Sequence, residues 1–294
     1  MQVKVYAKLN LTLNVGEKQG DFHPIDSVAT SVDVCDVVEV TTRTDKQVRV
    51  SGVQSVAQER NTAYRAARAF VEAFDTNGVD IHIQKGIPFG GGLGGSSADA
   101  AAALYCLCKL QNVAMGCEKL PKICENIGSD VTFMLRGGLG RLRGKGDKAE
   151  YFTLKQPLYF ALTTFEQEMS SREVYAAFDR VVRKSAMEEF QRSEKKNEFL
   201  LSLLLEQGAS EQALACLSND LQLAATTISN YAEAYLQFAK AHALNAVMTG
   251  SGSAYYVAFS SRDEAEKAVN LLNFSGFSTF LCQSVPKGIE IIAF

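Results

Sequence analysis

Hydrophobic and polar positions alternate along the first fifteen residues. Every odd position from Val3 to Val15 is apolar, and polar residues occupy most even positions. A period of two is typical of strands with one buried face. The alternation therefore predicts strand structure here, and it places Lys8 and Asn10 together on the opposite face.

Similar patterns divide the rest of the chain. Apolar residues recur at helical spacing from Asn61 to Phe74, which predicts a helix. Further strands are expected near residues 36–43, 47–52, 79–85, 158–165, 244–259, 278–285 and 288–294, and further helices near 96–110, 118–127, 171–182, 186–243 and 261–272. The charged stretch 192–198 predicts a solvated helix face or loop. These elements together predict an α+β protein with two domains, residues 1–155 and 156–294.

One loop combines unusual backbone freedom with a strong helix former. Glycines occupy residues 90–92, 94 and 95, and an alanine-rich segment follows. Glycine costs about 1 kcal/mol relative to alanine in regular structure, so such a run shapes a turn or clears space. Ser96 and Ser97 are suited to a helix start, whose free N–H groups bind anions. We therefore expect an anion-binding loop, in which Gly92 leaves space for a phosphate.

Several known glycine loops compete for this stretch. Gly90-x-Gly92-x-x-Gly95 matches the dinucleotide pattern, but residues 85–89 separate it from the preceding strand, and no acid follows near residues 110–114. A protein kinase would also need HRD and DFG motifs. A P-loop would need Gly-Lys-Ser/Thr, which neither this loop nor residues 144–146 provide. From the loop alone, a purely structural turn remains an alternative.

Composition narrows the class of protein. The 294 residues are 47% hydrophobic and 21% charged, with a net charge of -3, which is typical of a soluble globular protein. The charge gives no electrostatic basis for binding nucleic acid. The seven cysteines are scattered and lack zinc spacing, as expected for reduced thiols. With no apolar run of membrane length, we expect a cytoplasmic protein without nucleic-acid or membrane partners.

Three motifs in order resemble the GHMP kinases, the family of galactokinase, homoserine kinase and mevalonate kinase. "IPFGGGLGGSSADAA" (residues 87–101) resembles their phosphate loop, "MTGSGSAYYVAF" (248–259) their C-terminal glycine turn, and the first strand their polar substrate-side strand. The resemblance implies an N-terminal domain like one in a ribosomal protein and a ferredoxin-like C-terminal α/β sandwich. It also implies ATP and Mg²⁺. The ribosomal likeness makes an RNA-binding protein an alternative, which the acidic balance disfavours.

The resemblance assigns roles to individual residues. Asp130 would accept the proton of the acceptor hydroxyl, and Lys8 would lie beside it and stabilise phosphoryl charge. The simpler interpretation is that Asp130 caps a turn and Lys8 is an ordinary strand lysine. Asp99 is expected to point away from the phosphates or toward Mg²⁺, whose ligands remain unknown. Nucleotide contacts are implied for Asn61, Lys85, Pro88, Phe89, Gly90, Gly91, Gly92, Leu93, Gly94, Gly95, Ser96, Ser97 and Ala98.

The N-terminal segment "AKLNLTLNV" and the following "GDFHP" resemble the branch of this family that phosphorylates a cytidylyl sugar alcohol in non-mevalonate isoprenoid synthesis. That branch implies Asn10 as a substrate contact, Phe22 and Tyr175 stacked on the base, and a ring nitrogen of His23 at the base edge. The branch usually has Asp-Gly-Tyr-His where this chain has Gly-Asp-Phe-His at residues 20–23.

Other interpretations of these residues stay open. Phe22 and Tyr175 would otherwise be core residues, and His23 a solvated loop residue. A homoserine- or mevalonate-type kinase would have no base to hold. A catalytically inactive binding protein is the third alternative, and the presence of both Lys8 and Asp130 argues against it.

Overall fold

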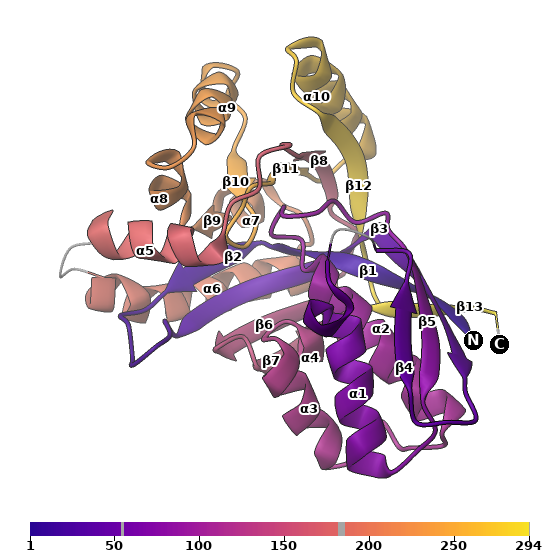
Figure 1. The fold of residues 1–294 in the computed structure, drawn as a ribbon. Coiled ribbons are helices and arrows are strands. Elements are labelled where there is room, and N and C mark those ends of the chain that lie inside the picture. The colour runs from indigo at the N-terminus through magenta and orange to yellow at the C-terminus, as the bar shows by residue number, and fades with distance from the viewer. Residues whose placement is uncertain (54–55, 182–185, 294) are drawn as a thin grey trace.

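The long strand β3 (Ile25–Thr42) organises the fold of the computed structural model, which describes residues 1–53, 56–181 and 186–293. β3 pairs antiparallel with β1 (Gln2–Asn10), β6 (Leu139–Gly144) and β5 (Val79–Gln84). At Ser31 and Val32 it also pairs with β12 (Thr279–Val285). Because β12 belongs to the C-terminal strands, β3 connects the strands of both halves (Figure 1).

The other elements follow in chain order. The strands are β2 (Thr12–Val15), β4 (Val48–Ser51), β7 (Lys148–Phe152), β8 (Tyr159–Thr163), β9 (Ser218–Asn219), β10 (Ala246–Met248), β11 (Tyr255–Phe259) and β13 (Ile289–Ala293). The helices are the 3₁₀ turn η1 (Gln58–Arg60), α1 (Thr62–Phe74), α2 (Gly95–Leu110), α3 (Lys119–Ile127), α4 (Val131–Arg136), α5 (Ser171–Val181), α6 (Ala186–Glu206), α7 (Glu211–Ala215), α8 (Gln222–Thr226), α9 (Asn230–Ala241) and α10 (Arg262–Phe274).

Helices α1 to α4 gather below β1 in Figure 1, with β4 and β5 to their right. α2 is buried along most of its length, and alanines fill its middle from Ala100 to Ala103. α1 packs against it through its own small buried residues and Phe70. Small side chains let the two helices approach closely. The N-terminus of α2 lies near the end of β1, where the Lys8 N–H donates to the Leu93 carbonyl at 3.0 Å.

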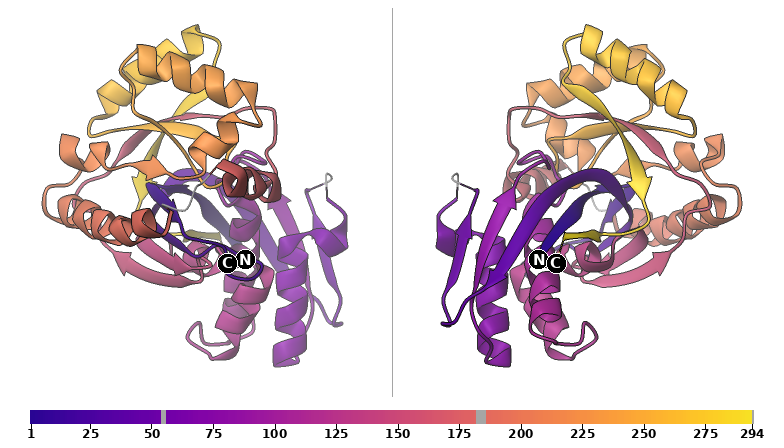
Figure 2. Two further views of the ribbon diagram at one scale, coloured as in Figure 1. Left: turned by 90° about the vertical axis from the view of Figure 1, so that its left-hand side faces the viewer. Right: turned by 90° about the vertical axis from the view of Figure 1, so that its right-hand side faces the viewer.

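The C-terminal strands form a second layer, in the order β10-β11-β8-β12. Their core includes Tyr235 of α9, Tyr255 of β11 and Phe178 of α5. The last strand, β13, leaves this layer and pairs with β1, so that Gln2 lies opposite Ala293. The chain termini therefore lie side by side (Figure 2).

The predicted α+β architecture is confirmed, and the structure refines several elements. The alternating segment from Val3 to Val15 forms two strands, because Leu11 leaves the ladder and its N–H donates to the Val28 carbonyl. The strand expected near residues 36–43 is the end of the longer β3. Residue 182 of the expected helix 171–182 and residue 294 of the expected strand 288–294 lie outside the described residues. The division at residue 155 stays a prediction.

The charged stretch 192–198 lies within α6 and is only partly solvated. Its charged side chains Glu194 and Glu198 are exposed, but Ser193 and Asn197 are buried on the opposite side. The expectation of a solvated segment was incomplete, since it ignored the small polar residues between the charges. In the described part of the chain, no helix combines the length and the apolar character that crossing a bilayer requires.

Candidate active site

The glycine loop leads from β5 into the N-terminus of α2. Gly90, Gly92 and Gly94 have φ angles of 66°, 71° and 75°, a region that side chains other than glycine rarely adopt. Gly94 immediately precedes the first turn of α2. The N–H groups of a first turn lack partners within the helix, so this end of α2 suits an anion.

The C-terminal glycine turn packs directly on this loop. The N–H groups of Ser253 and Ala254 donate to the carbonyls of Gly90 and Gly91, at 3.0 and 3.3 Å. A Cβ atom on Gly92 would lie 2.2 Å from the Thr249 carbonyl oxygen. The expectation that Gly92 clears space for a phosphate is therefore wrong, because the protein's own second turn fills that space.

Residues of both turns line a cavity of about 790 Å³. Most predicted site residues line it: Lys8, Asn10, Asn61, Lys85, Pro88, Phe89, Gly90, Gly91, Gly92, Leu93, Gly94, Gly95, Ser96, Ser97, Asp130 and Tyr175. Ala98, Phe22 and His23 are not among the lining residues. The N–H of Ala98 donates to the Gly94 carbonyl at 2.9 Å, so it is already used within the helix.

Lys8 and Asp130 meet at the wall of this cavity. The Lys8 ammonium lies 3.5 Å from a carboxylate oxygen of Asp130, and the lysine side chain is buried. Asp130 occupies the N-cap position of α4, yet its side chain accepts no hydrogen bond from that helix. The carboxylate faces Lys8 instead of capping the turn, which favours a chemical role over the simpler interpretation.

Lys85 lies between two buried carboxylates. Its ammonium donates to Asp36 and, at 2.9 Å, to Asp99. Asp36 also accepts the N–H groups of Gly86 and Ile87, at 2.7 and 2.8 Å. Burial raises the pKa of Asp99 to about 7; Lys85 lowers it, and the charge of Asp36 raises it. Among the described residues, the second oxygen of Asp99, Oδ1, has no hydrogen-bond partner.

The raised pKa of Asp99 predicts a pH-dependent stability. An ordinary aspartate has a pKa of about 3.9, so between about pH 4 and 7 the folded protein binds this proton more tightly than the unfolded chain. Folding stability from this group therefore falls as pH rises. Asp99→Asn cannot ionise, so its melting temperature relative to wild type should rise between about pH 5 and 8.

This comparison is made by thermal melting without nucleotide or metal. Asp45→Asn is the matched control, since Arg43 holds the pKa of Asp45 at about 2, outside the scanned window. A melting difference for Asp99→Asn that stays constant across the scan would show that Asp99 is ionised throughout.

Two further predicted nucleotide contacts have structural tasks of their own. The Asn61 side-chain oxygen caps α1 by accepting the N–H groups of Ala63 and Tyr64, at 2.9 and 3.3 Å. Phe89 is 52% exposed, and the Lys85 ammonium lies 5.2 Å from its ring centroid. At this side of the cavity, the exposed ring of Phe89 and the N-terminus of α1 are both part of the lining.

Of the residues predicted to hold a base, His23 lies next to Tyr175. The His23 ring is stacked on Tyr175, with centroids 5.4 Å apart. One ring nitrogen of His23 contacts the Gly16 carbonyl at 2.9 Å, and the other contacts Asp179 at 3.1 Å. Both ring nitrogens are thus occupied, which contradicts the expectation that one of them reads a base edge. Burial raises the pKa of Tyr175 to about 12, so its hydroxyl stays neutral.

Sequence reasoning missed some residues of the cavity. Lys145, on the turn between β6 and β7, lines it, and its ammonium lies 4.5 Å from the Phe22 ring centroid. The flanking Gly144 and Gly146 could have marked this lysine. Ser129 and Ser251 also line the cavity. Nothing in the local sequence indicates Asp36, because its partner Lys85 lies 49 positions away.

A glycine loop at a helix N-terminus, a second glycine turn packed on it and a Lys–Asp pair at a shared cavity form the arrangement expected of a small-molecule kinase. Residues 61–138 match the model of the GHMP kinases N terminal domain, and residues 200–276 match that of the GHMP kinases C terminal domain. The chain is 31% identical over 295 residues to the 4-diphosphocytidyl-2-C-methyl-D-erythritol kinase of Caldanaerobacter subterraneus, covering 99% of both proteins. It is 35% identical to the enzyme of that name from Cutibacterium acnes, over 90% of this chain and 86% of the relative.

Solved structures share the fold. A crystal structure of 4-(cytidine 5'-diphospho)-2C-methyl-D-erythritol kinase aligns with a TM-score of 0.75 at 24% identity, covering 97% of this chain and all (100%) of that one. Homoserine kinase from Cytophaga hutchinsonii aligns at 0.79 with 17% identity, covering 99% and 97%. Because the two differ in acceptor, the fold does not distinguish acceptors. The sequence relatives and the family models show that the chain belongs to the 4-diphosphocytidyl-2-C-methyl-D-erythritol kinase family of ATP-dependent GHMP kinases.

Proposed function

We propose that this enzyme transfers the γ-phosphoryl group of ATP to the 2-hydroxyl of 4-diphosphocytidyl-2-C-methyl-D-erythritol, a step of isoprenoid precursor synthesis. The observation that carries the chemistry is the Lys8–Asp130 pair, 3.5 Å apart at the cavity shared by the two glycine turns. The acceptor is inferred from relatives of that name that align along nearly the whole chain. We place the reaction in the cytoplasm, and between domains comprising residues 1–155 and 156–294.

In this reaction the acceptor oxygen attacks the γ-phosphorus. The bond from that phosphorus to the bridging oxygen breaks, and its electron pair leaves with ADP. Asp130 takes the proton of the attacking hydroxyl, and the Lys8 ammonium stabilises charge on the transferring group. The backbone of residues 90–97 and the N-terminus of α2 hold the phosphates of ATP, while Asn61, Lys85, Pro88 and Phe89 lie on the nucleoside side.

Mg²⁺ would accompany the ATP phosphates and neutralise part of their charge. Within the described residues there is no group of three or more His, Cys, Asp or Glu side chains placed to hold a metal ion. Asp99 lines the same cavity, and its buried, unpartnered Oδ1 is an oxygen of the kind that Mg²⁺ prefers. We propose that this atom is the protein's contact with the ion.

The acceptor would occupy the side of the cavity lined by Asn10, Lys145 and Tyr175. A tyrosine face suits a cytosine ring, and a lysine ammonium suits the acceptor's diphosphate. Phe22 and His23 stay assigned to this side as supports: Phe22 contacts Lys145, and His23 stacks on Tyr175. A homoserine- or mevalonate-type acceptor has no base to stack on the aromatic face.

A panel of alcohols tests the acceptor. With ATP and Mg²⁺, we expect ADP release with the cytidylyl substrate and at most trace release with homoserine or mevalonate. Preferred turnover of either small alcohol would replace the proposed acceptor. ATP binding without turnover of any acceptor would support the inactive-binding-protein alternative. Phosphorus NMR of the product identifies the hydroxyl that carries the new phosphate.

A further inference from the structure

The side-chain amide of Asn10 takes part in three buried hydrogen bonds. Its oxygen accepts from the Lys8 ammonium and, at 3.0 Å, from the Gly250 N–H of the C-terminal glycine turn. Its nitrogen donates to the Ser27 hydroxyl at 2.8 Å. An amide has one accepting end and one donating end, so its orientation decides whether both donors find an acceptor.

The Ser27 hydroxyl anchors the donating end of this amide. Ser27 lies on β3 with no exposed surface, and its hydroxyl donates to the Thr12 carbonyl. With its proton committed there, the hydroxyl oxygen presents a lone pair to the Asn10 nitrogen. A reversed Asn10 amide would put its NH₂ group against the Lys8 ammonium and the Gly250 N–H, which are both donors. The Ser27 hydroxyl therefore favours one of the two amide orientations.

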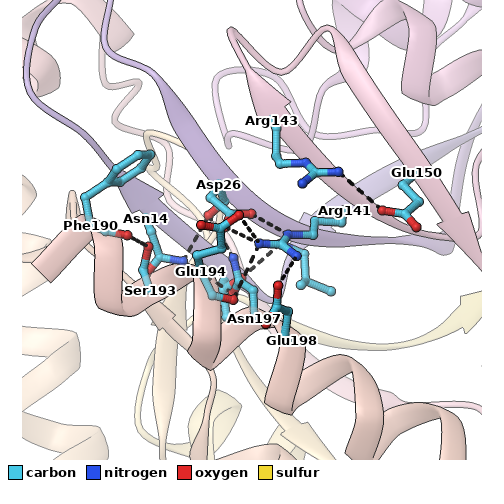
Figure 3. Close-up of polar contacts among 12 residues, drawn as sticks. Asn14, Asp26, Arg141, Arg143, Glu150, Phe190, Ser193, Glu194, Asn197 and Glu198 are labelled. Atoms are coloured by element: carbon cyan, nitrogen blue, oxygen red, sulfur yellow. Dashed lines mark hydrogen bonds and ion pairs between the residues drawn. The ribbon is translucent and has the colours of Figure 1, made fainter.

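The Thr12 carbonyl is itself held in place from helix α6. The Thr12 hydroxyl donates to the side-chain oxygen of Asn197 at 2.7 Å and accepts the Val28 N–H at 2.9 Å. Asn197 donates in turn to the Asp26 carbonyl at 3.1 Å, and Figure 3 shows it among the polar side chains beneath β3. Because these groups are buried, the acceptor of the Ser27 proton has little freedom to move.

We propose that Ser27 is a positioning residue for phosphoryl transfer, acting through Asn10 to hold the Lys8 ammonium beside Asp130. The proposal rests on the catalytic assignment of Lys8 and Asp130 made above. In the described part of the chain, the Lys8 ammonium has two polar side-chain partners, Asn10 and Asp130. Removing the Ser27 hydroxyl frees the donating end of the Asn10 amide, and this weakens one of the two contacts that place the Lys8 ammonium.

Ser27→Ala tests this role in the full-length enzyme. We expect kcat for the cytidylyl substrate to fall by about 10- to 100-fold, as for misplacement of a reacting group, while KM for ATP changes by less than about threefold. Ser27→Thr restores the hydroxyl and should recover most of the lost turnover. Ser284→Ala is the matched control: it removes another buried hydroxyl, which accepts the Leu158 N–H at 2.9 Å and does not line the cavity. It should lower the melting temperature and leave kcat unchanged.

A double-mutant cycle separates positioning from general destabilisation. If Ser27 acts through Asn10, then Asn10→Ala/Ser27→Ala should be no slower than Asn10→Ala alone. Wild-type kcat in Ser27→Ala, or a further full loss in the double variant, would overturn the proposal.

The side-chain NMR signal of Lys8, assigned with Lys8→Met, gives a readout that needs no acceptor. It should move toward that of a solvated lysine in Ser27→Ala, and an unchanged signal also overturns the proposal. If wild-type enzyme phosphorylates no cytidylyl substrate, the proposed acceptor fails, and this signal still decides the role of Ser27.

Discussion

Replacing Asp130 by asparagine should lower kcat by a factor of about 10² or more, the usual contribution of a positioned general base. Asparagine keeps the shape of the side chain but cannot take the proton of the attacking hydroxyl. It also loses the charge that faces Lys8 at 3.5 Å. KM for both substrates should change little, because neither the glycine turns nor Tyr175 is altered. Steady-state kinetics and ATP calorimetry on the same preparation measure the two effects.

Asp33→Asn provides the control for this substitution. Asp33 lies on β3 and its carboxylate accepts the Gln283 N–H at 2.9 Å, so the same chemical change is made outside the cavity. It should leave kcat unchanged. If the Asp130→Asn enzyme kept most of the wild-type turnover, Asp130 would have no part in the mechanism. A loss of ATP affinity as large as the loss of turnover would make it a binding residue.

Arg141→Met should lower the free energy of unfolding by about 3–5 kcal/mol, the usual cost of removing one partner of a buried ion pair. Arg141 donates to both carboxylate oxygens of Asp26, at 2.8 and 2.7 Å, and each residue is about 5% exposed or less. The exposed carboxylates of Glu194 and Glu198 on α6 lie 3.7 and 3.5 Å from the same guanidinium (Figure 3). Methionine would leave the Asp26 carboxylate buried and unpaired.

Arg143, two positions along β6, offers a matched control. Its guanidinium lies 3.4 Å from Glu150, and both side chains are about half exposed (Figure 3). Arg143→Met should therefore cost no more than about 1 kcal/mol. Urea denaturation of both variants gives the comparison, and equal losses would show that burial of the Arg141 pair has no special cost. Arg141→Met combined with Asp26→Leu should recover much of the lost stability, since no buried charge remains.

The sequence by itself determined the local elements and the class of the protein. The period of two over Val3 to Val15 indicated strands, and the spacing over residues 61–74 indicated α1, because periodicity reports which face of an element is buried. The glycine run before α2 indicated an anion loop, because glycines shape a turn and the serines that follow suit the N-terminus of a helix. The ordered motifs then led to the kinase family, which the family models and relatives confirm.

The sequence placed the candidate catalytic residues only in part. The strand period put Lys8 and Asn10 on one face, which agrees with their direct contact. The pairing of Lys8 with Asp130 followed from the resemblance, since nothing in the spacing of residues so far apart brings them together. Their catalytic roles stay predictions until the variants above are measured.

Only the tertiary structure decided which polar groups satisfy one another. Gly92 must be glycine because the Thr249 carbonyl reaches it from the other end of the chain. The His23 ring nitrogens are occupied by Gly16 and Asp179, and Asn197 is buried within a stretch that looks solvated. Gly92 has no room for a side chain, whereas His23 and Asn197 are explained by the need of a buried polar group for a partner. When the partner comes from a distant segment, the local sequence pattern does not predict it. The pair is then seen only in the folded chain.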